Sequence, residues 1–231
     1  MAPATPTIVL TGGDPVSPAL AGQLPADAYV IAADSGLASA ARLGLTVDLL
    51  VGDMDSVDQA AMAAAVDGGT EVERHPVAKD RTDLAIALDA ALARDVRDVL
   101  VVGGHGGRLD HLLGNALVLA SDVYAALRIE AFMGAAHLHV VRDHATLAGA
   151  RGELVSLLPL HGPARGVTTE GFLYPLAGED LPAGSTRGVS NEFTGTSAAV
   201  SLTDGVLLVV QPGALGVHVR AGIVPPSTPR S

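Results

Sequence analysis

Short β-branched and aliphatic runs alternate with alanine- and leucine-rich stretches over about the first two thirds of the chain. The short runs have the length of buried strands, and in the longer stretches apolar residues recur at the spacing of one helix face. This alternation predicts a parallel sheet with helices on both of its faces. The expected strands are residues 7–10, 29–33, 48–51, 98–102 and 127–132, and the expected helices are residues 37–43, 59–66, 82–94 and 110–120.

The pattern changes near residues 142–152, after which short strands are broken by Gly, Pro and Thr. Two of these strands, residues 197–202 and 206–210, flank an Asp204-Gly205 pair, which predicts a tight hairpin. The fold class expected is therefore α/β, with an N-terminal Rossmann-like parallel-sheet domain followed by a small all-β, sandwich-like domain. The expected divisions are residues 1–145, residues 146–220 and a flexible Pro- and Ser-rich tail at residues 221–231.

Composition excludes several kinds of function. The 231 residues include no cysteine, so a disulfide scaffold, a thiolate metal site and a cysteine nucleophile are all excluded. A formal net charge of -11 argues against binding to nucleic acid or to an anionic membrane surface, which would require clustered Lys and Arg. No apolar run reaches the roughly 18 residues of a spanning helix, and no signal sequence is recognisable. We therefore expect a cytoplasmic protein.

Two carboxylates follow the expected strand at residues 48–51. Asp53 and Asp55 lie two positions apart, so in an extended segment they share one face at the carboxyl end of a sheet strand. Paired oxygen ligands suit Mg²⁺, which binds a few carboxylates together with water and substrate phosphates. The alternative is a solvated turn in which aspartate is simply a common residue.

A charged segment opens the expected helix at residues 82–94. Thr82 is suited to be its N-cap, and Asp83 lies in the first turn, where the helix dipole favours an anion. Lys79, the chain's single lysine, could meet a phosphate as a point charge, and Asp83 could add a third carboxylate. The alternative is a capped helix start with ordinary surface charge.

A glycine-rich loop, Gly103-Gly104-His105-Gly106-Gly107-Arg108-Leu109-Asp110-His111, joins the strand at 98–102 to the next helix. Glycines allow backbone N–H groups to approach an anion, and the following helix N-terminus adds favourable partial charge. The loop matches neither the Walker A pattern nor Gly-x-Gly-x-x-Gly. A tight strand-to-helix turn is the alternative. The histidines show no metal-binding spacing, and no Gly-x-Ser-x-Gly elbow is present.

Taken together, these segments resemble the thiamine pyrophosphokinase family over nearly the whole chain. Each motif is weak alone, but their order and spacing are specific. The matching stretches are Ala33-Asp34-Ser35-Gly36, Val51-Gly52-Asp53-Met54-Asp55-Ser56, Lys79-Asp80-Arg81-Thr82-Asp83, the glycine-rich loop, Gly166-Val167-Thr168-Thr169-Glu170-Gly171-Phe172-Leu173-Tyr174-Pro175-Leu176 and Gly188-Val189-Ser190-Asn191-Glu192.

The resemblance implies transfer of pyrophosphate from ATP to the hydroxyl of thiamine, giving thiamine diphosphate and AMP. It also implies a homodimer whose active sites combine the α/β domain of one subunit with the β domain of the other. Asp53, Asp55 and Asp83 would hold Mg²⁺, and Arg108 and Asp110 complete the expected catalytic set. The substrate-binding residues implied are Asp34, Lys79, Asp80, Thr82, Gly104, Gly106, Gly107, His111, Asn115, Ser190 and Asn191.

The chain departs from the family pattern in two places. Ser35 stands where glycine is commoner, and no tryptophan is present to stack on the pyrimidine ring of thiamine. Phe172, Tyr174 or Phe193 would have to replace it. The alternative functions are a related diphosphokinase acting on a pterin alcohol and a non-catalytic protein that binds thiamine or a nucleotide.

Overall fold

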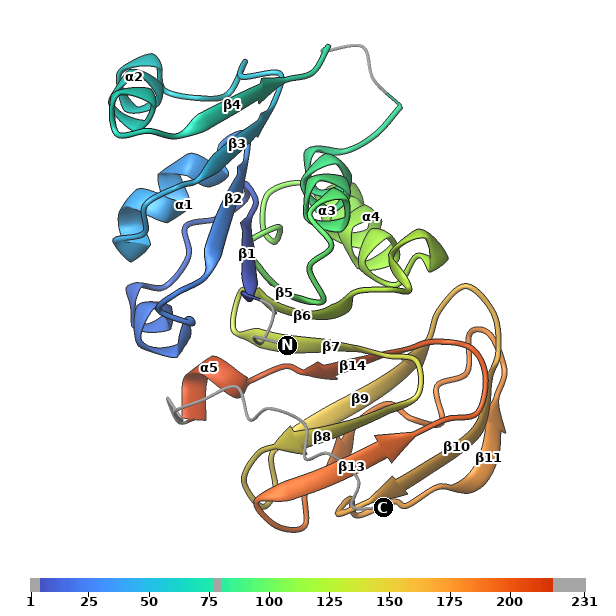
Figure 1. Ribbon diagram of the computed structural model, residues 1–231. Helices are drawn as coiled ribbons and strands as arrows, with labels where there is room; N and C mark the ends of the chain where they lie inside the picture. Colours follow the sequence, from blue (N-terminus) through green and yellow to red (C-terminus); the bar gives the residue numbers. More distant parts are fainter. Residues whose placement is uncertain (1–4, 77–79, 218–231) are drawn as a thin grey trace.

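The structure, a computed structural model, describes residues 5–76 and 80–217, and it contains one 10-stranded and one 4-stranded sheet (Figure 1). The larger sheet has the order β12-β9-β14-β7-β6-β5-β1-β2-β3-β4, and the smaller has the order β11-β10-β13-β8. The strands are β1 (Thr7–Leu10), β2 (Tyr29–Ala33), β3 (Leu49–Gly52), β4 (Glu71–Arg74), β5 (Asp98–Val102), β6 (Arg128–Met133), β7 (Ala136–Val141), β8 (His144–Ala148), β9 (Leu154–Pro159), β10 (Ala164–Glu170), β11 (Ala177–Leu181), β12 (Asn191–Glu192), β13 (Ser197–Ser201) and β14 (Leu207–Gln211). The helices are η1 (Pro18–Gln23), α1 (Gly36–Leu43), α2 (Gln59–Asp67), α3 (Asp83–Ala93), α4 (Leu109–Leu119), η2 (Asp122–Tyr124) and α5 (Ala214–Val217).

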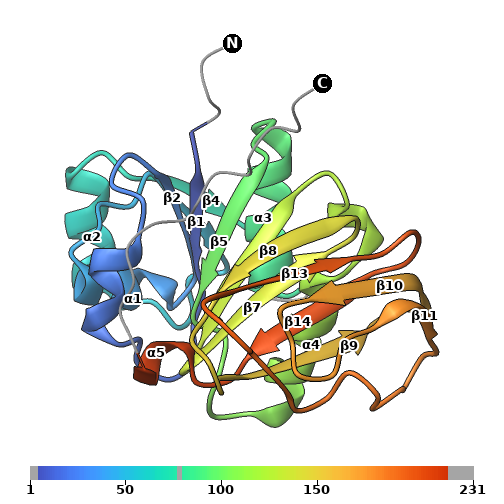
Figure 2. The same cartoon turned by 90° about the horizontal axis from the view of Figure 1, so that it is seen from below.

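The first six strands form a parallel sheet with helices on both faces, as expected, although β4 was not among the predicted strands. Alternate residues of each strand face opposite sides, so that Val9 packs towards α3 and α4 whereas Ile8 packs towards α1 and α2. Figure 2 shows α1 and α2 on one side of these strands and α3 on the other. The sequence expectation of a parallel sheet covered on both faces is therefore confirmed.

Helix starts agree with the local sequence. Thr82 is the N-cap of α3, and its hydroxyl accepts a hydrogen bond from the Ala85 N–H. Asp58 caps α2 in the same way through the Ala61 N–H, at 2.8 Å. Each cap satisfies one of the backbone donors left free in the first turn of a helix. The predicted role of Thr82 as an N-cap is confirmed.

The larger sheet continues past β6 into antiparallel strands. β7 pairs antiparallel with β6 and with β14, which in turn pairs with β9. The smaller sheet packs on this antiparallel half (Figure 1) and encloses a second core that includes Leu147, Leu157, Val167, Val200 and Leu207. The second half is thus a sandwich in which one layer belongs to the same sheet as the α/β half.

The domain division stays a prediction. The expected boundary after residue 145 falls inside β8, and the larger sheet spans both sides of it. The expected flexible tail lies outside the described residues. Among the residues that the structure describes, no helix is long and apolar enough to cross a membrane.

The predicted hairpin at Asp204-Gly205 is wrong. β13 pairs with β10 and β8 in the smaller sheet, whereas β14 pairs with β7 and β9 in the larger one, so this turn carries the chain from one layer to the other. The turn is held instead by β10, because the Arg165 N–H donates to the Asp204 carbonyl and the Thr203 N–H donates to the Arg165 carbonyl. Gly205 has a φ of 91°, and a Cβ there would lie 2.4 Å from the Pro163 carbonyl oxygen.

We expect Gly205→Ala to destabilise the fold by about 1–3 kcal/mol, because alanine adds both a strained backbone and a backbone clash. Gly213→Ala is the matched control, since a Cβ at Gly213 meets nothing within 4 Å. Urea unfolding followed by circular dichroism measures both variants. Equal unfolding free energies for the two variants would contradict the close approach at Gly205.

Candidate functional site

Three carboxylates meet at the carboxyl ends of β2 and β3. Asp34 follows β2, and Asp53 and Asp55 follow β3, the neighbouring parallel strand. One oxygen from each residue lies within 4.8 Å of the others. The carboxyl edge of a parallel sheet is where α/β folds bind ligands, and a group of oxygen donors there is suited to a divalent cation.

An unusual backbone conformation holds this carboxylate cluster, Asp34, Asp53 and Asp55, in place. Asp34 and Met54 have positive φ angles of 48° and 66°. The Asp34 N–H donates to the Val51 carbonyl at 2.8 Å, which fixes one loop against the other. The Asp55 N–H donates to Asp53 Oδ1 at 3.1 Å. Left-handed residues cost energy and are retained where the surrounding structure requires them, so the two loops are built to bring these side chains together.

Asp34 is the buried member of the carboxylate cluster. It is 6% exposed, and its Oδ1 is buried with no hydrogen-bond partner. Burial raises the pKa of Asp34, the negative charges of Asp83 and Asp53 raise it further, and hydrogen bonds with Ser35 and Ser56 oppose the rise. A buried, unpartnered carboxylate oxygen among other negative charges is the environment that a cation would relieve. The donor set therefore fits a divalent metal ion.

Asp83 lies close enough to this cluster for its charge to act on Asp34. The third carboxylate within 4.8 Å of Asp53 and Asp55 is nevertheless that of Asp34. From the sequence, we expected Asp83 to be this third ligand. Sequence reasoning assigned Asp34 to substrate instead. One feature of the sequence could have indicated the role of Asp34, because it directly follows one strand as Asp53 follows another. The sequence does not show, however, that these two strands are neighbours.

Among the described residues, the group of close carboxylates includes no member of the charged segment. Lys79 is outside the described residues. Asp80 is exposed, and Arg81 is paired with Asp89 at 2.7 Å and donates to the Tyr124 hydroxyl. Arg81 therefore ties the start of α3 to the middle of that helix and to η2.

The glycine-rich loop packs against the loop that follows β1. Its Gly104 N–H donates to the Gly12 carbonyl at 2.8 Å, and the Asp14 N–H donates to the His105 carbonyl, also at 2.8 Å. Asn115, buried on α4, donates its amide to the Gly104 carbonyl at 3.0 Å. The predicted site residue Asn115 thus positions the loop. Gly106 and Gly107 have positive φ angles of 82° and 60° farther along it.

Arg108 and Asp110 are exposed and form an ion pair, with Arg108 Nε 3.1 Å from Asp110 Oδ1. The hydrogen bond from Arg108 and its positive charge lower the pKa of Asp110. A carboxylate held in its charged form is a weak base, which disfavours Asp110 as a proton acceptor. His111, the next residue, is exposed in the first turn of α4.

Asn191 has a structural role in the second half. Its Oδ1 accepts from the Tyr174 N–H at 3.0 Å, and its Nδ2 donates to the Tyr174 carbonyl at 2.7 Å. Asn191 is buried and holds the turn that carries Tyr174, whereas Ser190 beside it is exposed, with a φ of 58°. Asn191, a predicted binding residue, therefore stabilises the turn that carries Tyr174.

The structure also separates the three aromatic candidates for ring stacking. Phe172 and Phe193 pack edge to face in the second core, with ring centroids 5.2 Å apart, and both are buried. Tyr174 is 63% exposed. Tyr174 is therefore the aromatic side chain of the three that a substrate ring can reach.

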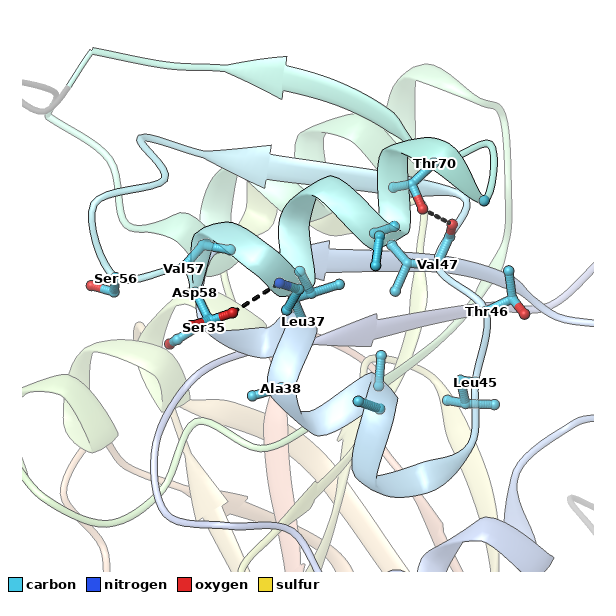
Figure 3. A pocket seen from close by; sticks show the side chains of 16 residues that line it. Ser35, Leu37, Ala38, Leu45, Thr46, Val47, Ser56, Val57, Asp58 and Thr70 are labelled. Carbon is cyan, nitrogen blue, oxygen red and sulfur yellow. Dashed lines mark hydrogen bonds between the residues drawn. The ribbon is translucent and has the colours of Figure 1, made fainter.

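An apolar pocket of about 470 Å³ between α1 and α2 was not predicted (Figure 3). Small side chains of the two helices line most of it, and Ser35 and Ser56, neighbours of the carboxylate cluster, lie at one end. Its Thr70 hydroxyl donates to the Val47 carbonyl, and its Asp58 side chain caps α2. The pocket therefore offers space for an apolar group rather than for a phosphate.

Two family profiles match successive parts of the chain. The profile described as "Thiamin pyrophosphokinase, catalytic domain" matches residues 22–131, and the one described as "Thiamin pyrophosphokinase, vitamin B1 binding domain" matches residues 137–207. The first match includes the carboxylate cluster and the glycine-rich loop, and the second includes the turn held by Asn191.

Named relatives agree with these matches. The thiamine pyrophosphokinase of Bacillus subtilis (strain 168) is 26% identical over 209 residues, which cover 89% of this chain and 98% of that protein. The crystal structure of the Bacillus subtilis thiamine pyrophosphokinase superposes with a TM-score of 0.77 at 27% identity, over 90% of this chain and 98% of that one. The thiamin pyrophosphokinase structure from Geobacillus thermodenitrificans gives a TM-score of 0.72 at 30% identity, over 89% and 96% of the two chains.

We expect Asp34→Asn to stabilise the metal-free protein at neutral pH by up to about 1 kcal/mol, because it removes a buried negative charge. Since folding raises the pKa of Asp34 above its ordinary value of 3.8, its destabilising effect is complete above the raised pKa and disappears as pH falls towards 3.8. The gain should therefore shrink on acidification. Asparagine also tolerates positive φ.

Thermal unfolding in the presence of a chelator at several pH values measures this effect. Asp27→Asn, at an exposed position, is the control and should change nothing. A less stable Asp34→Asn protein at neutral pH would mean that the Asp34 carboxylate is satisfied within the fold.

Proposed function

The chain belongs to the thiamine pyrophosphokinase family, and from this premise we propose that it transfers the terminal pyrophosphoryl group of ATP to the hydroxyl of thiamine, releasing AMP. The observation that carries the proposal is the carboxylate cluster at the carboxyl ends of β2 and β3, in a sheet whose β5 opens into a glycine-rich loop. The pterin-alcohol diphosphokinase is not favoured, because the second half matches the vitamin B1 binding profile, and the non-catalytic alternative is not favoured, because the first half matches the catalytic-domain profile.

Asp34, Asp53 and Asp55 are the residues that we propose hold a divalent metal ion, with Asp83 adding negative charge nearby. Mg²⁺ is proposed because all three donors are carboxylate oxygens. When bound, the ion would neutralise phosphate charge, which explains how a chain with a net charge of -11 binds a polyanion. The carboxylates orient the ion, and the left-handed backbone at Asp34 and Met54 fixes their positions.

The phosphate groups would meet the glycine-rich loop and Arg108. The loop backbone lies directly before the N-terminus of α4, which supplies N–H donors and a favourable dipole. Arg108 is exposed and can leave Asp110 for a phosphate oxygen, since exposed ion pairs contribute little stability. Lys79 would act as a second point charge.

The cationic thiazolium ring of thiamine is attracted to acidic groups, so the carboxylate cluster favours this co-substrate as well. Tyr174 is the proposed stacking side chain, Asn191 holds its turn, and Ser190 is exposed next to Asn191. The proton of the thiamine hydroxyl would pass to a carboxylate of the cluster or to Asp110, whose pKa is lowered while Arg108 is bound to it.

We further propose that two subunits share each active site. Three leucines on α4, Leu109, Leu113 and Leu117, recur every four residues and are exposed directly after the glycine-rich loop. In the second half, Leu173, next to Tyr174, and Val189, two residues before Asn191, are also exposed. Apolar surface beside both parts of the proposed site supports a partner chain that covers them.

We expect the wild-type protein to release AMP from ATP when thiamine is added, and not when a pterin alcohol replaces it. Asp53→Asn should lower kcat by about a hundredfold or more while leaving the fold intact, because it weakens the proposed metal site. Asp58→Asn is the matched control, since asparagine caps a helix as well as aspartate does. A coupled AMP assay at limiting Mg²⁺ measures all three proteins.

Near-wild-type activity of Asp53→Asn would remove the metal assignment. Release of AMP with the pterin alcohol and not with thiamine would instead replace the proposed substrate. Loss of activity in Asp58→Asn to the same extent would show that the assay reports damage to the fold.

The shared site predicts complementation between two inactive variants. Asp53→Asn and Asn191→Ala homodimers, refolded together in equal amounts, should recover roughly a quarter of wild-type activity. Half of the dimers are mixed, and each mixed dimer has one site with both lesions and one with neither. Tagged subunits verify exchange, and circular dichroism verifies the fold of Asn191→Ala. No recovery despite exchange would place each site within one chain.

A further inference from the structure

A second cluster of possible metal ligands lies outside the proposed active site. Glu130 on β6 and His137 and His139 on β7 each offer one donor atom, and these atoms lie within 4.8 Å of one another. β6 and β7 are antiparallel neighbours, with Glu130 opposite His139. We propose that Glu130, His137 and His139 bind one transition-metal ion of the Zn²⁺ class, at a site separate from the carboxylate cluster.

The distances suit such an ion. His137 Nε2 lies 2.7 Å from Glu130 Oε2, and His139 Nδ1 lies 3.5 Å from the same oxygen. Ligands about 2.0–2.2 Å from a tetrahedral zinc ion lie about 3.4 Å from one another. The two distances to Glu130 Oε2 therefore differ from this spacing by less than about 1 Å. Two imidazoles and one carboxylate form a mixed donor set that favours Zn²⁺ and its neighbours over Mg²⁺.

Gln211 on β14 determines which nitrogen of His139 faces the cluster. Its Nε2 donates to the Ala148 carbonyl at 2.9 Å, so its Oε1 is the acceptor for His139 Nε2, 3.0 Å away. The proton of His139 is therefore on Nε2, and the lone pair of Nδ1 points towards Glu130. A second partner that fixes a ligating imidazole in this way is typical of protein metal sites.

The hydrogen bond to Gln211 leaves the Nδ1 lone pair of His139 facing Glu130 Oε2, 3.5 Å away. Two hydrogen-bond acceptors in this position repel each other. A cation between them converts this repulsion into two bonds.

The Glu130, His137 and His139 cluster is well separated from the carboxylate cluster. Glu130 is level with Val30 of β2 through the register of β5 and β1, and three strand spacings, about 14 Å, separate β6 from β2. Asp34 lies four residues beyond Val30, about 13 Å farther along the strand. Glu130 is 36% exposed, which gives an ion access. The ion would join β6 to β7 where the sheet changes from parallel to antiparallel.

Cobalt is the probe for this site, because tetrahedral Co²⁺ absorbs visible light and Zn²⁺ replaces it. The full-length protein, stripped of metal by a chelator, should bind one Co²⁺ per chain, release it to Zn²⁺ and retain it in excess Mg²⁺. An Asp53→Asn/Asp55→Asn double variant should bind Co²⁺ like wild type. Glu130→Gln and His137→Gln should each lose binding at least tenfold, and Gln211→Ala about 10–100-fold.

His144→Gln is the matched control, because His144 is exposed and lies beside Asp143 in the same half. Circular dichroism establishes that each variant is folded. If a histidine variant does not fold, Glu130→Gln alone tests the site, because glutamine has nearly the same shape as glutamate. Absence of a stoichiometric Co²⁺ spectrum in wild type would overturn the proposal. So would loss of the spectrum in the Asp double variant alone, or equal spectra in His137→Gln and His144→Gln.

Discussion

Repulsion among carboxylates at the ends of two neighbouring strands is the constraint around which the first half is organised. Parallel pairing of β2 with β3 brings Asp34 next to Asp53 and Asp55, and positive φ angles at Asp34 and Met54 keep them there. The fold leaves Asp34 Oδ1 without a hydrogen bond. Stability is thus reduced at one point of the sheet so that a charged ligand can be bound there, a common arrangement at functional sites.

The local sequence pattern predicted most helices and strands correctly, but it did not predict which strands pair with one another. Five of the six parallel strands were predicted because they are short apolar runs, and α1 to α4 were predicted because burial of one helix face imposes a period on the sequence. β4 was missed, since its segment Glu71–Arg74 is a polar edge strand with little burial. The hairpin at Asp204-Gly205 was wrong, because the residues that bind this turn come from β10, far away in sequence.

The candidate site shows the same limit. The sequence placed Asp53 and Asp55 together because two residues in one segment share a face. It assigned Asp34 to substrate binding and not to the metal, because strand order decides which loops are neighbours and a single sequence does not contain that order. Burial likewise decided among the aromatic candidates, since Phe172 and Phe193 pack in the core whereas Tyr174 does not.

The continuity of the larger sheet has a consequence for motion. β7 pairs with β6 through residues 136–139 and with β14 through residues 137–141, so the two halves of the chain share one ladder of backbone hydrogen bonds. Rigid-body hinge closure between the halves would require that ladder to open. Enclosure of a substrate therefore falls to the loops at the ends of the strands, which can rearrange while the sheet remains a fixed frame.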